Sequence, residues 1–215
     1  NSTAVIRKPM YVPPTEHADN SAKFIVSGSS VSVADIVAQG VVEKNGAWFD
    51  AATLTPLAAS TNWLSSGAKT PASYYRILAG GLTVNAAYDV TIPESGILSG
   101  PGGLVKTGAR TLTLAAANTY EGTTTVREGT LEVTGSLAGP LELEGGTLAL
   151  GGGAAIPRLA VSAKGALTLN GDGVTVGAAS GYDGRLQVTA TNLGRFNAGT
   201  VLVRSPDTAF LEGAV

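Results

Sequence analysis

The sequence predicts an all-β protein built as a β-solenoid, in which short parallel strands of successive coils stack into long sheets. Three observations carry this prediction. The chain of 215 residues contains 29 glycines, and Thr, Ser, Ala, Val and Leu are frequent, which is typical of strands separated by many turns. From Leu82 onward, a short apolar-x-apolar unit recurs at a nearly constant spacing. No helical period is evident in that part of the chain.

Residues 1–80 have a different pattern, which predicts irregular coils with an N-terminal cap or a junction to an upstream domain. A separate small domain is the alternative, and the sequence does not decide between them. Residues 1–22 are expected to be extended and poorly ordered, and Ala34–Gln39 to contain one helical turn. The expected strands include Phe24–Val26, Val31–Val33, Val41–Val42, Gly46–Phe49 and Tyr75–Leu78, with a turn at Gly28–Ser29 between the first two.

Residues 81–215 are predicted to form the regular solenoid. The first series of units is Leu112–Leu114, Leu131–Val133, Leu148–Leu150, Leu167–Leu169 and Leu186–Val188, and Val201–Val203 is a candidate sixth member. The second series is Thr124–Val126, Leu141–Leu143, Leu159–Val161 and Val174–Val176. Spacings of mostly 17 to 19 residues in both series predict coils of that length, each contributing strands to at least two sheets.

Strand geometry explains why these units indicate a stacked core. Alternate residues of a strand face the same side, so the outer two members of each unit are expected to point inward and the middle one outward. Stacking then places Leu on Leu and Val on Val. A β-sandwich also has short strands, but it would not keep one Gly-Thr-Leu-x-Leu phrase in register every 17 to 19 residues.

One stretch is specific enough to compare with a known family. Residues 103–114 read GLVKTGARTLTL, residues 115–122 read AAANTYEG, and residues 123–133 read TTTVREGTLEV. This stretch resembles the autotransporter-associated β-strand repeat, also called the passenger-associated transport repeat. It departs from the family pattern at Arg110, Ala116 and Thr123, where the family usually has Gly. The matching motif residues are Lys106, Gly108, Leu112, Leu114, Asn118, Tyr120, Gly122, Val126, Gly129, Leu131 and Val133.

The resemblance implies a right-handed parallel β-helix that is the exported passenger of a type V secretion protein. It implies a location at the bacterial cell surface or outside the cell, and an outer-membrane β-barrel translocator of the same protein as partner. The repeat would then assist passage or folding at the outer membrane. Asn118 and Tyr120 are expected to form a turn motif, with the asparagine bonded to its own loop and the tyrosine hydroxyl in water.

Composition argues against several function classes. The net charge is −2 with no run of one sign, so nucleic acid is not an expected partner. The chain has no cysteine and a single histidine, His17, which leaves little material for imidazole catalysis or for a metal site. Its longest apolar runs are far shorter than the roughly 20 residues that span a bilayer, and Asn1 is not followed by a leader pattern. No cofactor is predicted.

No catalytic motif stands out either. The carboxylates of Glu121, Glu128, Glu132, Glu142 and Glu144 are close in sequence, but Glu132 and Glu142 belong to different strand series and are expected on different sheets. The Glu16–Asp19 segment lies between prolines, and Asp172 is expected in a tight turn. The sequence therefore predicts a structural or adhesive passenger stalk that is not an enzyme, with host cell-surface or matrix molecules as further partners. Two alternatives remain: the stem of an upstream enzyme such as a protease, or a glycan-active β-helix enzyme.

Overall fold

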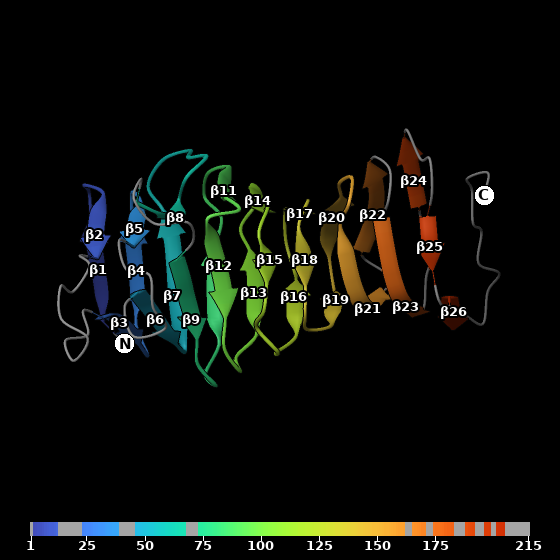
Figure 1. Ribbon diagram of the computed structural model, residues 1–215, viewed down its shortest axis with the longest axis horizontal. Coiled ribbons are helices and arrows are strands. Elements are labelled where there is room, and N and C mark those ends of the chain that lie inside the picture. Colours follow the sequence, from blue (N-terminus) through green and yellow to red (C-terminus); the bar gives the residue numbers. More distant parts are fainter. Residues whose placement is uncertain are drawn as a thin grey trace.

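In the computed structural model, the chain forms a stack of parallel coils that extends from β1 at one end to β26 at the other (Figure 1). The structure describes residues 2–12, 23–38, 46–67, 73–161, 165–170, 174–182, 188–191, 196–198 and 201–204. Successive coils pair through parallel strands. The described ranges contain only strands, turns and loops, so no helix among them could cross a membrane. The predicted parallel β-solenoid is confirmed.

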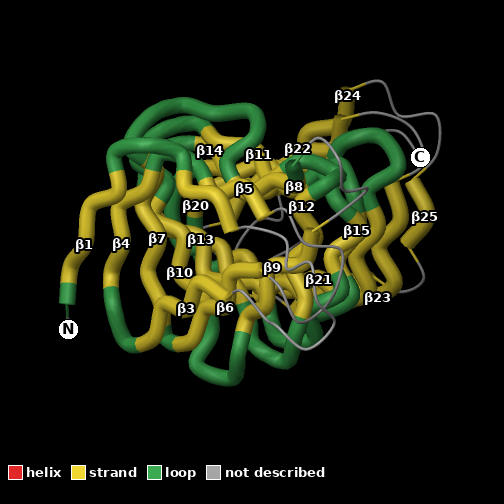
Figure 2. The backbone as a smooth tube through the Cα atoms, turned by 60° about the vertical axis from the view of Figure 1, so that its left-hand side comes forward, coloured by secondary structure: helices red, strands yellow, loops and turns green. Residues whose placement is uncertain are grey.

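Each of the first six coils contributes three strands, one to each of three faces that surround a shared core (Figure 2). The first face consists of β1 (Thr3–Ile6), β4 (Ser30–Val33), β7 (Ala52–Pro56), β10 (Leu82–Asn85), β13 (Leu104–Thr107), β16 (Thr124–Val126), β19 (Leu141–Leu143) and β21 (Ala155–Val161). The second face begins with β2 (Met10–Val12), β5 (Ile36–Ala38) and β8 (Leu64–Ser66). It continues with β11 (Val90–Ile92), β14 (Thr111–Leu114), β17 (Thr130–Val133), β20 (Gly146–Leu150), β22 (Gly165–Asn170) and β24 (Val188–Thr191).

The third face consists of β3 (Lys23–Ser27), β6 (Gly46–Asp50), β9 (Ser73–Ile77), β12 (Gly96–Ser99), β15 (Ala117–Asn118) and β18 (Ser136–Leu137). Because β18 also pairs with β21, β15 and β18 belong to the same sheet as the first face. In that sheet, β23 (Val174–Tyr182) pairs with β21, β25 (Phe196–Ala198) and β26 (Val201–Arg204). Contacts outside the strand ladders bridge the two interruptions in the faces. Ser60 forms an isolated bridge with Val90 between β8 and β11, and the Thr119 N–H donates to the Leu98 carbonyl at 2.8 Å between β12 and β15.

The core is a set of inward rows that run along the stack. On the second face, Leu112 pairs with Leu131 and Leu131 with Leu148, and all three are fully buried. The middle residues of the same units, Thr113 and Glu132, point outward and are partly exposed. The predicted register of the first series is therefore confirmed from Leu112 through Leu167, which pairs with Leu148.

Coil length increases toward the N-terminus. Thr125 pairs with Glu142 at the predicted spacing, whereas Thr53 pairs with Thr83. The longer coils accommodate larger loops, yet β7 pairs with β10 and β10 with β13 without a break. Strand pairing is thus continuous on both sides of residue 80. The proposed division into residues 1–80 and 81–215 therefore concerns the regularity of the coils.

Three expectations for the N-terminal part have a definite outcome. The strands expected around the Gly28–Ser29 turn are present as β3 and β4. The helical turn expected at Ala34–Gln39 is wrong, because β5 pairs with β2 and β8 and uses its backbone groups in that sheet. The poor order expected for residues 1–22 is wrong for β1 and β2, which pair with β4 and β5. Val41–Val42 lies outside the described residues.

The expected C-terminal register is partly wrong. Leu167 pairs with Val188 instead of Leu186, a shift of two positions that keeps the same residues on one face. The unit at Val201–Val203 pairs with β23 and so belongs to another sheet than Leu167. Val176 pairs with Ile156, and Ala179 takes the predicted place opposite Leu159. Coil length changes in this region, so the spacing of apolar units in the sequence no longer predicts which residues pair.

Candidate functional site

Two polar side chains interrupt the apolar inward rows of the first face. Lys106 lies in β13 between Val84 of β10 and Val126 of β16. Thr124 lies in β16 next to Leu104. Both side chains are fully buried, although such rows otherwise consist of aliphatic residues. Burying an ammonium or a hydroxyl is costly unless it is hydrogen-bonded, so each of the two requires local partners.

Lys106 has a complete set of partners. Its Nζ atom donates to the carbonyl oxygens of Thr107 at 2.9 Å, Gly108 at 2.8 Å and Glu128 at 2.9 Å. An ammonium group has three N–H donors, so all of them are used. The first two acceptors lie in the coil of Lys106 and the third in the next coil. The side chain therefore joins the corners of two successive coils from inside the core.

Two opposing effects act on the pKa of Lys106. Burial lowers the pKa of Lys106 to about 8, while the nearby carboxylates of Glu128 and Asp89 act in the opposite direction. Glu128 also accepts a hydrogen bond from the Gly108 N–H through Oε2 at 3.3 Å. Its backbone carbonyl and its carboxylate thus both bind the Lys106–Gly108 corner.

Thr124 is paired with Tyr120. The tyrosine hydroxyl lies 2.5 Å from the Thr124 Oγ1 atom, and the ring is fully buried. The expectation that this hydroxyl lies in water is therefore wrong. The ring turns inward because the inward row offers a hydroxyl partner four residues later. Burial raises the pKa of Tyr120 above its ordinary value, and the hydrogen bond with Thr124 acts against this.

Asn118 connects the third face across two coils. Its Oδ1 atom accepts from the Leu98 N–H at 3.0 Å, and its Nδ2 atom donates to the Ala116 carbonyl at 2.9 Å. The side chain is buried. The bond to Ala116 is the expected one within its own loop, and the bond to Leu98 adds a connection to the previous coil. We call Lys106, Asn118, Tyr120 and Thr124 the polar core cluster.

Three glycines, the first two of them motif residues, lie at close contacts between coils. Gly108, Gly129 and Gly146, which we call the glycine corner, have φ angles of +77°, +65° and +70°. A Cβ atom on Gly129 would collide with the Gly108 carbonyl oxygen, and one on Gly146 with that of Gly129. Gly122 lies at another corner, where a Cβ atom would collide with the backbone of Gly102. These sites require glycine because neighbouring backbones meet there.

The remaining motif residues form the apolar surroundings of the polar core cluster. The inward residues of β14 and β17 are fully buried, and so is Val126 in β16. Those of β14 and β17 are Leu112, Leu114, Leu131 and Val133. Sequence reasoning did not identify the role of Thr124 or the inward position of Lys106. The alternation that begins at Leu104 could have indicated the second.

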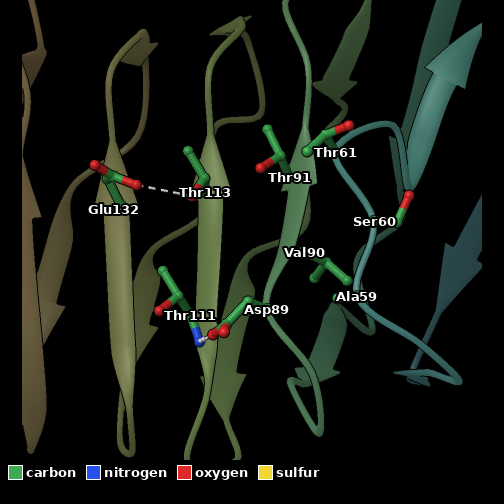
Figure 3. A pocket seen from close by; sticks show the side chains of 9 residues that line it. All are labelled: Ala59, Ser60, Thr61, Asp89, Val90, Thr91, Thr111, Thr113 and Glu132. Carbon is green, nitrogen blue, oxygen red and sulfur yellow. Dashed lines mark hydrogen bonds between the residues drawn. The ribbon is translucent and has the colours of Figure 1, made fainter.

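An open groove of about 650 Å³ lies on the outer surface of the second face (Figure 3). Its floor is a straight row of outward side chains on three adjacent strands, because Thr91 pairs with Thr113 and Thr113 pairs with Glu132. The full lining comprises Ala59, Ser60, Thr61, Asp89, Val90, Thr91, Thr111, Thr113 and Glu132. Two oxygens are already positioned by neighbours. Thr113 Oγ1 donates to Glu132 Oε2 at 2.9 Å, and the Thr111 N–H donates to Asp89 Oδ1 at 2.8 Å.

The wall of the groove is the loop that contains Ala59, Ser60 and Thr61, and it is hydrogen-bonded to both neighbouring coils. Ser60 Oγ donates to Asp35 Oδ1 at 2.6 Å in the preceding coil. Its backbone N–H donates to the Asp89 carbonyl at 3.1 Å, and its carbonyl accepts from the Thr91 N–H at 2.8 Å. Trp63, fully buried just behind the wall, donates from its backbone N–H to the Thr91 carbonyl at 3.0 Å. These bonds fix the wall against the floor.

The carboxylates considered in the sequence do not converge. Glu132 is on the second face and Glu142 on the first, as expected. Glu144 forms an exposed ion pair with Arg127 at 2.9 Å. Within the described residues, no group of three His, Cys, Asp or Glu side chains is placed to hold a metal ion. The Glu16–Asp19 segment, with His17, and Asp172 lie outside the described residues.

Comparison with known proteins supports the family suggested by the motif. The model of the family described as passenger-associated-transport-repeat matches residues 104–133. Among curated proteins, an extracellular serine protease of Serratia marcescens is 52% identical over 52 residues, which is 24% of this chain. The aligned segment covers 5% of that relative, so this chain spans only a small part of its length. No solved structure matches the chain.

The matched residues coincide with the coils that contain the polar core cluster and part of the glycine corner. The family match and the similarity to an extracellular protein agree with each other. They indicate a protein segment that is exposed at the cell surface or secreted. Residues 104–133 carry a passenger-associated transport repeat, and the comparisons support its interpretation as a repeat of an autotransporter passenger.

Proposed function

We propose that this chain is a structural stalk within an autotransporter passenger, and that its transport repeat forms early and templates the remaining coils during export. The polar core cluster carries the proposal. A solenoid core of aliphatic rows alone does not define which coil stacks on which, because every Leu row resembles the next. Lys106, Asn118 and Tyr120 have specific partners, and such buried polar groups favour one register over its alternatives.

The position of the cluster supports a folding role. Lys106 joins its own coil to the following one through Glu128, and Asn118 joins its coil to the preceding one through Leu98. Three consecutive coils are thereby connected by side-chain bonds in addition to the strand ladders. In a repeat protein, folding can nucleate in any group of neighbouring repeats and spread from there, so coils with additional bonds between them are suited to be the nucleus. A translocator in the outer membrane would release such coils one after another, so a stable nucleus would favour outward movement.

The role as a stalk leaves the chemistry to other parts of the passenger. The described carboxylates lie apart or are bound to neighbouring groups, as Glu128 and Glu144 are. A passenger of this kind can hold an upstream enzyme away from the cell surface, and the similarity to an extracellular serine protease is in keeping with that arrangement. Adhesion is a second candidate function, favoured by the groove on the second face.

The test compares two buried tyrosines of similar chemistry. Tyr120→Phe removes a hydroxyl inside the repeat, and Tyr75→Phe removes one outside it. The single Tyr75 hydroxyl proton is shared between the Ser65 and Ile36 carbonyls, which lie 2.6 and 2.9 Å from the hydroxyl oxygen. Each change is expected to cost about 1–2 kcal/mol. If the repeat is the nucleus, Tyr120→Phe mainly slows folding, whereas Tyr75→Phe mainly accelerates unfolding.

The same pair, introduced into the complete passenger gene, tests export. At matched loss of stability, the Tyr120→Phe passenger should reach the cell surface more slowly than the Tyr75→Phe passenger, as measured by accessibility to added protease. Equal partition between folding and unfolding rates, together with equal export, would contradict the proposed role of the repeat.

A further inference from the structure

The groove on the second face has the chemistry of a carbohydrate site. We propose that it binds a short neutral oligosaccharide along the Thr91–Thr113–Glu132 row, which deepens the adhesive role and rests on the proposed surface exposure of the passenger. The row crosses adjacent strands, whose spacing is about 4.8 Å. A linear sugar lying across the strands would place successive rings over successive side chains.

The charge of the groove lining indicates that its ligand carries no negative charge. Asp89 and Glu132 are the charged residues of the lining, which contains no lysine or arginine. Hydrogen bonding from the Thr111 N–H holds the pKa of Asp89 below its ordinary value, so Asp89 is negatively charged at neutral pH. Sulfated, phosphorylated or carboxylated ligands would be repelled. The two carboxylates also supply too few oxygen ligands for a strong calcium site.

The geometry of the groove surface favours a sugar over a peptide strand. The floor belongs to a sheet whose backbone groups already pair with the coils on either side, so a peptide strand finds no free edge for main-chain pairing. The lining mixes apolar and polar atoms, since Ala59 and the threonine methyl groups lie among hydroxyl and carboxylate oxygens. A sugar has the matching pattern, with C–H faces that pack on apolar atoms and hydroxyl edges that exchange hydrogen bonds.

Several polar atoms remain available for these bonds. Within the described part of the chain, Glu132 Oε1 and the hydroxyls of Thr61 and Thr91 have no hydrogen-bond partner, whereas Glu132 Oε2 is held by Thr113. A carboxylate fixed at one oxygen presents the other in a defined direction, where it can accept from a sugar hydroxyl. The wall is also preformed, because Ser60 is bonded to both neighbouring coils, so little ordering cost is expected on binding.

The experiment titrates the purified chain with short neutral oligosaccharides of glucose, galactose and mannose, and follows backbone amide shifts by NMR. At least one series is expected to bind saturably, with the shifts concentrated at Thr91, Thr113 and Glu132. Because the lining has no aromatic ring for stacking, affinities near the millimolar range are expected. Glu132→Gln should weaken binding roughly tenfold, which corresponds to about 1.4 kcal/mol for a lost charge-assisted bond.

Glu142→Gln is the matched control, since Glu142 is also an outward carboxylate but lies on the first face. It should leave the affinity unchanged. Thr91→Val tests the floor independently of charge. Saturable binding that both Glu132→Gln and Thr91→Val weaken supports the proposal. No saturable binding to any neutral series, equal weakening by Glu142→Gln, or binding of heparin, Ca²⁺ or polylysine in place of neutral sugar would overturn it.

Melting curves of each variant separate loss of binding from loss of folding, and Glu132 is partly exposed, so its substitution should shift the melting temperature little. The result is also independent of the folding role. Sugar binding is measured on the folded chain, whereas the export proposal depends on Tyr120→Phe and Tyr75→Phe, so either proposal can fail alone.

Discussion

The Nζ atom of Lys106 lies 2.9 Å from the carbonyl oxygen of Glu128, one coil further along the stack. A lysine therefore occupies an inward row, between two valines, and its charged end reaches the corner where two coils meet. Its stem packs as a hydrocarbon while its ammonium binds backbone, which is how a long cationic side chain can be accommodated in a core.

This burial predicts a specific pH dependence of stability. The pKa of Lys106 is about 8 in the folded chain and about 10.5 when unperturbed. Between these values the unfolded chain binds more protons than the native one, so the free energy of unfolding should rise with pH, by about 1 kcal/mol per unit. Urea denaturation from pH 7.5 to 9.5 would measure this rise.

The matched variant is Lys106→Met, which keeps most of the apolar volume and cannot titrate. Its stability should be flat over the same range. Above pH 10 both proteins should lose stability, because Tyr75 and Tyr120 have raised pKa values and resist ionisation only in the folded state. A wild-type profile that is parallel to that of Lys106→Met would contradict the burial of the charged group.

The glycine corner predicts a contrast between two substitutions. Gly129→Ala would place a methyl group against the carbonyl oxygens of Gly108 and Arg110, whereas Gly153→Ala meets no atom within 4 Å. Both sites have positive φ, so both pay about 1–2 kcal/mol of backbone strain. Gly129→Ala should be less stable than Gly153→Ala by at least about 2 kcal/mol in urea denaturation. Equal losses would mean that the coils can separate at this corner without cost.

Register is tested by a charge placed in the core. Leu148 is fully buried between Leu131 and Leu167, so Leu148→Asp should cost several kcal/mol or prevent folding. Thr83→Asp, at a partly exposed outward position of β10, is the control and should cost less than about 1 kcal/mol. Thermal unfolding followed by circular dichroism is the measurement, and an unchanged melting temperature for Leu148→Asp would refute the inward assignment.

The sequence predicted the fold well where coil length is constant. Leu112, Leu131 and Leu148 could be aligned because inward positions recur in strands of one register. Beyond Leu167 the coils lengthen, and the pairing moves to Val188. The strand at Ile36 was expected to be helical, because local propensity carries no information about hydrogen bonds supplied by neighbouring coils.

The candidate sites were harder to predict for a related reason. The motif identified Tyr120, but only the folded chain places its hydroxyl against Thr124 instead of water. The groove depends on Ser60 and Thr113, which come from different coils and different parts of the sequence. Periodicity predicts which side chains face outward, and it does not predict how a loop such as residues 57–63 folds over them.

The glycine corner has a consequence for how such proteins change length. Gly129 and Gly146 each meet the bare backbone of a glycine in the preceding coil, whereas at Gly108 the side chains of Asn85, Lys106 and Glu128 also take part. Removing or duplicating one complete coil between Gly129 and Gly146 would therefore rejoin similar backbone surfaces. The length of the stack can then change by one whole coil at a time, while each remaining coil keeps its contacts.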